Sequence, residues 1–155
     1  MKKYIGSCLV EAEPMTREDY NAFRGWSIPA DEDPKDKGYL MKCPDGLVTW
    51  KPADFFEKHY VKVDDNQELP SGVSIGQKMV DEFIAYTEIK TMGTKTTVVR
   101  CVLRNGFEIV ESTGCVDEKN YSEKVGYEIC MERIQSKIWE LLGFLLQTAW
   151  QGVNN

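Results

Sequence analysis

The stretch TTVVRCVLRNGFEIVESTGC, residues 96–115, has the clearest structural pattern in the second half of the chain. Two runs rich in β-branched residues flank Asn105-Gly106, and this dipeptide is the strongest short signal for a tight turn between antiparallel strands. The sequence therefore predicts a β-hairpin with its turn at these two residues.

Two arginines inside one strand distinguish this hairpin. A two-residue turn pairs Arg104 with Phe107, and pairing then steps outward to Arg100 with Glu111. Directly paired side chains share one face of a sheet. The other face, with Glu108 as its only charge near the tip, is expected to meet the core through Leu103, Cys101, Val99 and Val110.

The face with the arginines has two interpretations. In the first, Arg100 forms a cross-strand ion pair with Glu111, and Arg104 lies over Phe107 at an exposed edge. In the second, the guanidiniums contact phosphate groups and Phe107 offers a stacking surface. The second interpretation predicts binding of a nucleotide-like anion, and the residues alone leave both open.

A helix is expected before the hairpin. Ser74 and Gln77 have the spacing of a capping box, and the apolar residues that follow recur at helical spacing. The pattern predicts a helix that fades by about Thr91, since Met92-Gly93 breaks it.

A longer helix is expected after the hairpin. Residues 120–122 offer an N-cap, and from Glu123 an apolar stripe follows the helical period: Tyr127, Met131, Ile134, Ile138, Leu141 and Leu145. Further apolar residues widen the stripe, which favours a homo-oligomer, a dimer or higher. Arg133 and Lys137 lie one turn apart on this helix and could bring positive charge to the hairpin from a neighbouring element or subunit.

The first 65 residues read as a separate module. A strand from residue 3 is expected to stop at Pro14, Thr16 can cap a short helix, and a second hairpin turns at Asp45-Gly46 before another helix. Residues 64–73 form a polar linker. We therefore expect an α+β protein with modules at 1–65 and 66–155: a small hairpin-and-helix unit, then an antiparallel hairpin packed with the preceding helix and the long C-terminal helix.

Composition and charge argue against some classes of partner and cell compartment for this chain. The 155 residues carry a net charge of -6, and neither half is basic, so duplex nucleic acid is not expected as a partner. No apolar run is long enough to span a bilayer, and the start turns acidic too soon for a signal peptide. Five cysteines without a CxxC spacing suit reduced thiols. We expect a cytosolic protein with no membrane partner.

Patterns typical of catalysis are missing from the sequence. It contains no glycine-rich phosphate loop, and the single histidine, His59, has no motif partner. The acidic run at residues 31–36 does not match a calcium loop. Glu128 and Glu132 lie one helical turn apart, as exposed charges often do. We expect no enzyme, no metal and no cofactor; a hydrolase would have to depend on Glu128 or His59.

Beyond these patterns, several stretches resemble a known family. KYIGSCLVEAEPMTREDYNAFRGW (3–26), DEDPKDKGYL (31–40) and the region from VLRNGFEIVESTGCVDEKNYSEKVGYEIC through ERIQSKIWELLGFLLQ (102–147) look like small phage and prophage proteins of the gene-forty-nine and gene-sixty-six product family. The specific part is NGF, a strand ending in CVD, N-[YF]-[SD], and KIWEL-x-G-[FY], over roughly residues 74–147. The N-terminal pattern says little about activity.

The C-terminal pattern is also similar to the first Thoeris anti-defence family. Members of that family are phage sponges, which act as oligomers and sequester cyclic ADP-ribose isomers without cleaving them; some also bind cyclic trinucleotides. The resemblance implies the same activity here, in the cytoplasm of the infected bacterial host. It implies Phe107 as a stacking group, Asn105 or Asn120 as an amide contact, and Arg133 with Lys137 as phosphate contacts.

The alternative is a protein of another class. An acidic phage accessory protein that binds and inhibits a host protein would also lack catalytic motifs. It would bind a host polypeptide and no nucleotide, and this difference separates the two hypotheses.

Overall fold

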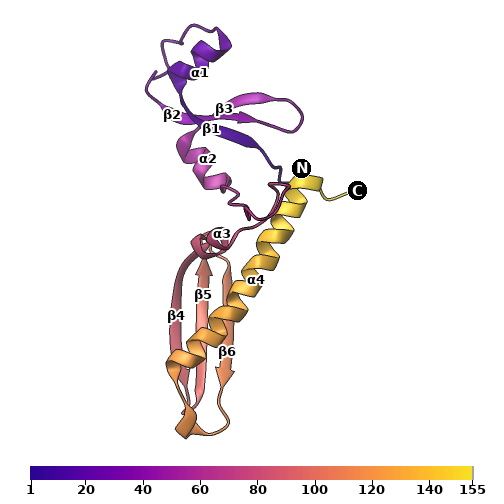
Figure 1. The fold of residues 1–155 in the computed structure, drawn as a ribbon. Helices are drawn as coiled ribbons and strands as arrows, with labels where there is room; N and C mark the ends of the chain where they lie inside the picture. Colours follow the sequence, from indigo (N-terminus) through magenta and orange to yellow (C-terminus); the bar gives the residue numbers. More distant parts are fainter. Residues whose placement is uncertain (155) are drawn as a thin grey trace. The chain divides into compact units, whose positions relative to one another are not determined.

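The computed structural model describes residues 1–154, which divide into two compact units (Figure 1). One unit holds residues 1–62 together with the residues from Gln147 onward, and the other holds Val63–Leu146. The sequence placed the boundary at residues 65 and 66. Each unit has a three-stranded antiparallel sheet with helices, which confirms the α+β class.

The first unit builds its sheet in the order β1-β2-β3, with both pairs antiparallel. A small core of Tyr20, Leu40 and Trp50 lies between this sheet and the first helix. The elements are β1 (Glu11–Thr16), α1 (Arg17–Arg24), β2 (Lys37–Lys42), β3 (Val48–Pro52) and α2 (Ala53–His59).

The start of the first unit differs from the prediction at Pro14. The strand begins at Glu11 and continues through Pro14, which is paired with Tyr39. β1 is an edge strand, where a residue without a backbone N–H is tolerated. The capping prediction is confirmed, because the Thr16 hydroxyl accepts a hydrogen bond from the backbone N–H of Asp19 at 3.1 Å.

The second unit begins with a shorter helix than the sequence predicted. α3 covers only Gln77–Glu82, and the chain then forms strand β4, Ile84–Met92. Ser74 does not cap the helix, because its hydroxyl accepts the backbone N–H of Asn66 at 2.9 Å. The residues of β4 include β-branched and aromatic side chains that suit a strand, and pairing with the hairpin outweighs the helical spacing. The hairpin is therefore part of a three-stranded sheet.

The predicted hairpin is confirmed, but its register is wrong by one residue. It consists of β5 (Thr96–Leu103) and β6 (Glu108–Gly114). Leu103 donates its N–H to Phe107 O at 2.8 Å, and Gly106 donates to Leu103 O at 2.8 Å, so the loop has three residues. Gly106 has a φ of 84°, which a turn of this kind requires at its last position. Arg100 consequently pairs with Val110 rather than Glu111.

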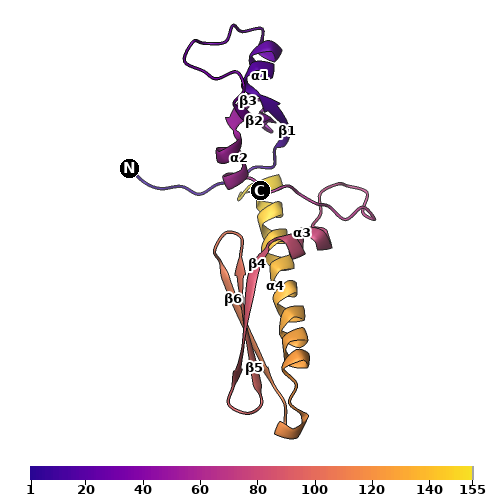
Figure 2. The same cartoon turned by 90° about the vertical axis from the view of Figure 1, so that its left-hand side faces the viewer.

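The long helix α4, Glu123–Gln151, starts where the sequence predicted and crosses one face of the sheet β4-β5-β6 (Figures 1 and 2). Its buried residues recur every four positions: Gly126, Cys130, Ile134, Ile138, Leu142 and Leu146. They meet the buried side chains of the sheet, among them Val99, Cys101, Leu103 and Ile109. The buried stripe is therefore rotated from the predicted one near its C-terminal end, where Leu141 and Leu145 are exposed.

No helix in residues 1–154 is both long and apolar enough to cross a bilayer.

Candidate functional site

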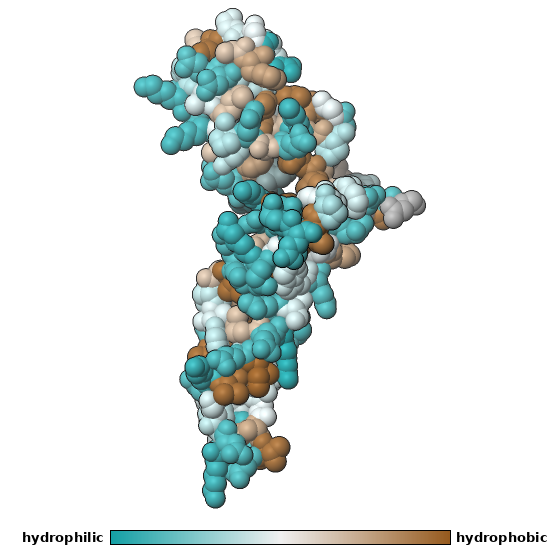
Figure 3. Space-filling view, in the orientation of Figure 1, coloured by the Kyte–Doolittle hydropathy of each residue, from teal (hydrophilic) through white to brown (hydrophobic). Residues whose placement is uncertain are grey.

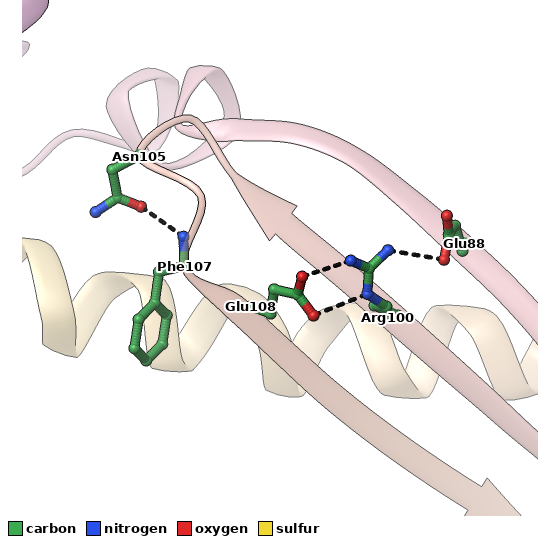
Figure 4. Close-up of polar contacts among 5 residues, drawn as sticks. All are labelled: Glu88, Arg100, Asn105, Phe107 and Glu108. Atoms are coloured by element: carbon green, nitrogen blue, oxygen red, sulfur yellow. Dashed lines mark hydrogen bonds and ion pairs between the residues drawn. The ribbon is translucent and has the colours of Figure 1, made fainter.

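Arg100 extends from the face of the sheet opposite to α4. Its guanidinium donates hydrogen bonds to Glu108 on β6 and to Glu88 on β4, with Nε–Oε2 and Nη1–Oε2 distances of 2.9 Å each (Figure 4). The hydrogen bond to Glu108 and, to a smaller extent, the one to Glu88 raise the pKa of Arg100 above its ordinary value. The bond to Arg100 lowers the pKa of the Glu108 carboxyl. Two carboxylates already occupy this guanidinium, so it is a structural cross-strand clamp.

Phe107 extends from the other face. Its backbone pairs with Leu103, whose buried side chain meets α4, and side chains of paired residues share a face. Figure 4 shows the ring pointing away from the ion pairs of Arg100, with α4 behind it. The ring is 54% exposed although it lies on the helix side. The expected arginine face with Phe107 is thus wrong: the one-residue change of register separates Phe107 from Arg100.

Asn105 has a structural role in the turn. Its side-chain Oδ1 accepts the backbone N–H of Phe107 at 3.0 Å (Figure 4). This contact fixes the loop and positions the backbone of Phe107. The side-chain NH₂ group is left for other contacts.

A shallow depression lies beside Phe107, between β6 and α4. Its volume is about 430 Å³, which is within the usual range for small-molecule sites of about 300–1,000 Å³. It is lined by Phe107, Glu108, Ile109, Val110, Lys137, Glu140 and Leu141. The depression therefore combines an exposed aromatic ring, aliphatic side chains and charges of both signs.

Lys137 is the cation in this depression. It forms an ion pair with Glu111, whose side chain is mostly buried. Arg133, one turn earlier on α4, donates from Nη1 to the backbone oxygen of Ser112 at 3.0 Å. Both basic residues thus lie along β6, as expected for charge brought by the helix, and Lys137 shares the depression with Phe107.

Arg104 and Asn120 lie elsewhere. Arg104 belongs to the exposed loop, and its backbone N–H donates to Phe83 O at 2.9 Å. Asn120 lines a separate small depression with Tyr121 and Gly126, at the other end of the sheet. At about 3.3 Å per residue along β6, that end is roughly 20 Å from Phe107. Asn120 cannot contact a small ligand bound at Phe107 of the same chain.

The candidate catalytic residues belong to different units, His59 to the first and Glu128 to the second. The His59 ring stacks on Phe55 with centroids 4.1 Å apart, and its Nδ1 lies 2.7 Å from Phe55 O. Glu128 is exposed on α4, where its partner is Lys124 at 4.0 Å. Within residues 1–154, no group of three or more His, Cys, Asp or Glu side chains could hold a metal ion.

Sequence reasoning missed Glu88, Glu140 and Leu141 as neighbours of the candidate residues. Glu88 falls within the helix that the sequence predicted, although its segment IAYTEIKTM contains the β-branched and aromatic residues that suit a strand. Leu141 was assigned to the buried stripe. Glu140 is adjacent to it and lies within the KIWEL motif, three residues after Lys137, so helical spacing could have placed it beside that lysine.

Comparison with known proteins identifies one family. Residues 75–150 match the model of the "Phage protein (N4 Gp49/phage Sf6 gene 66) family", which confirms the resemblance to this family for the second half of the chain. No curated protein and no solved structure matches the chain.

Proposed function

We propose that this chain, which belongs through residues 75–150 to this phage protein family, is an anti-defence sponge. It binds and sequesters cyclic ADP-ribose-type immune signals, and some cyclic oligonucleotides, without cleaving them. Acting in the cytoplasm of the infected bacterium, it thereby blocks Thoeris-type defence.

The observation that carries the proposal is that Phe107 and Lys137 line one depression. An aromatic ring provides a stacking surface for a base, and an ammonium group is a phosphate contact. The volume of about 430 Å³ suits a ligand of nucleotide size. These groups bind and orient a ligand, and none of them provides a nucleophile beside a general base.

The charges of the depression define how the ligand lies. Glu140 lines the same depression and repels phosphate, while Lys137 attracts it. The carboxylate of Glu108 is paired with Arg100 on the other face of the sheet. The phosphates therefore lie toward Lys137 and the neighbouring Arg133, and the base lies over Phe107. A phosphate at Lys137 competes with Glu111 for the ammonium group.

The test is sequestration followed by release. The full chain is incubated with cyclic ADP-ribose isomers, free ligand is removed by ultrafiltration, and the protein is then denatured by heat. We expect depletion of free ligand before heating and recovery of intact ligand afterwards, measured by mass spectrometry. Lys137→Met is expected to reduce the depletion, and Lys124→Met, an exposed lysine on the same helix, is the matched control.

Two outcomes contradict the proposal. One is no depletion of any cyclic ADP-ribose isomer, cyclic dinucleotide or cyclic trinucleotide, which leaves a host polypeptide as the partner to seek. The other is a cleaved product after heating, which shows an enzyme.

A further inference from the structure

The outer edge of strand β6 has backbone groups that nothing in its own chain pairs. β6 is the last strand in the order β4-β5-β6. The hydrogen bond from Leu103 N to Phe107 O fixes the alternation along the hairpin. Residues of an antiparallel strand point their N–H and C=O groups alternately toward and away from the partner strand. Four residues of β6 therefore direct these groups outward: Glu108, Val110, Ser112 and Gly114.

Arg133 covers this edge at Ser112, between Val110 and Gly114. Its guanidinium donates to the outward carbonyl of Ser112 at 3.0 Å, which agrees with the alternation. Within residues 1–154, the outward groups of Glu108 and Val110 have no hydrogen-bond partner. Arg133 therefore separates Gly114 from a short open segment next to the turn, and this segment is centred on Ile109.

We infer that this open edge pairs with the same edge of a second copy of the chain. Antiparallel pairing with Ile109 opposite itself places Glu108 of each copy opposite Val110 of the other. This register uses the outward groups that are open, leaves Ser112 with Arg133, and forms about four hydrogen bonds. It joins two three-stranded sheets into one continuous sheet.

The side chains beside the edge fit a two-fold contact. Val110 is 56% exposed, and Leu141 is 42% exposed on α4 at the helix side of the same edge. Both line the depression that holds Lys137 and Glu140. A two-fold axis brings equivalent patches together, so Lys137 of one copy approaches Glu140 of the other and the apolar side chains pack. Figure 3 shows apolar clusters between hydrophilic areas on the face of this unit that it presents.

A second copy explains the surface better than an extended peptide does. Between the turn and Arg133, only Glu108 and Val110 of the described strand offer open backbone groups, so a peptide strand gains few hydrogen bonds there. A second copy gains the same bonds and adds its own depression and helix side chains to the contact. The short open edge and the mixed charges of the depression thus favour pairing of the chain with itself. This inference does not depend on the ligand proposed above.

The test uses proline at two positions of one strand. Val110→Pro removes an outward N–H and leaves the bonds to β5 intact, since proline is tolerated at the solvent side of an edge strand. Ser112→Pro is the matched control, because its outward N–H lies outside the proposed pairing. Leu141→Glu tests the helix side of the contact without changing the sheet.

We expect the wild-type full chain to be a dimer in sedimentation velocity at about 100 μM, with a dissociation constant in the micromolar range or below. Val110→Pro and Leu141→Glu should raise this constant by about tenfold or more, and Ser112→Pro should leave it unchanged. Circular dichroism checks that each variant is folded. A wild-type chain that stays monomeric, or a dimer that neither variant weakens, overturns the inference. The inferred pairing of two copies would still hold if the protein bound no nucleotide.

Discussion

Arg100 and Phe107 belong to one hairpin but extend from opposite faces of its sheet. Arg100 pairs with Val110 and forms ion pairs on the face away from α4. Phe107 pairs with Leu103 and lines the depression on the helix side. The two residues therefore have different roles, one in the stability of the sheet and one in the proposed binding site, and separate variants can test them.

Removing the guanidinium should weaken the sheet alone. Arg100→Met leaves Glu88 and Glu108 without their shared partner on a solvent-accessible face. Exposed ion pairs contribute little each, so we expect a small fall in Tm, measured by circular dichroism. Arg104→Met is the control, because no ion pair of its side chain is found in residues 1–154. An equal change in Tm for Arg100→Met and Arg104→Met would contradict a stabilising role of the Arg100 ion pairs.

The same clamp predicts a pH dependence. The hydrogen bond from Arg100 lowers the pKa of Glu108 below its ordinary value of 4.5. A lowered carboxyl pKa stabilises the fold above 4.5, and this stabilisation is lost as pH falls through the pKa of the folded state. Wild-type Tm should therefore fall more than that of Glu108→Gln on acidification below about pH 4.5. If the Tm of wild type and the Tm of Glu108→Gln fall by the same amount on acidification, the hydrogen bond makes no such contribution.

A glycine sets how closely α4 packs on the sheet. A Cβ at Gly126 would lie 2.2 Å from the hydroxyl oxygen of Thr97, which is 1% exposed and 3.1 Å from the hydroxyl of Tyr121. Gly126→Ala should therefore cost about 1–3 kcal/mol in the free energy of unfolding. Gly143→Ala on the same helix meets nothing within 4 Å and should stabilise by roughly 0.5–1 kcal/mol. Denaturant titration measures both, and the same sign for both variants would contradict this packing.

The rotated helix stripe gives a test of the core. Leu142 is 2% exposed, whereas its neighbour Leu141 is on the surface of the unit. Leu142→Ala should cost about 2–5 kcal/mol because it leaves a cavity. Leu141→Ala should change the free energy of unfolding by less than about 1 kcal/mol, measured by urea titration at protein concentrations too low for self-association. If Leu141→Ala lowered the free energy of unfolding more than Leu142→Ala does, Leu141 would be the buried residue, as the sequence predicted.

Local signals in the sequence predicted elements well and register poorly. Asn105-Gly106 and Asp45-Gly46 each marked a hairpin, and both form a three-residue loop with glycine last and an Asn or Asp side chain that accepts a backbone N–H. The dipeptide does not distinguish a two-residue from a three-residue loop, and this difference moves the side chains of β6 to the other face.

The strand β4 was missed because its apolar residues also have helical spacing. Its identity depends on pairing with β5, which is a tertiary contact that a local pattern does not contain. Without β4, Glu88 could not be placed beside Arg100. The arginine therefore looked available for a ligand, although two carboxylates from neighbouring strands hold it.

The binding of a cyclic ADP-ribose isomer by the Phe107→Ala variant shows whether the depression between β6 and α4 is the ligand site. Isothermal titration compares it with wild type and with Arg100→Met, which alters the opposite face of the same hairpin. Base stacking contributes about 1–3 kcal/mol, so Phe107→Ala should raise Kd by roughly 5- to 150-fold, while Arg100→Met should leave Kd nearly unchanged. Wild-type affinity in Phe107→Ala, or loss of binding in a folded Arg100→Met, would contradict a ligand site at the depression between β6 and α4.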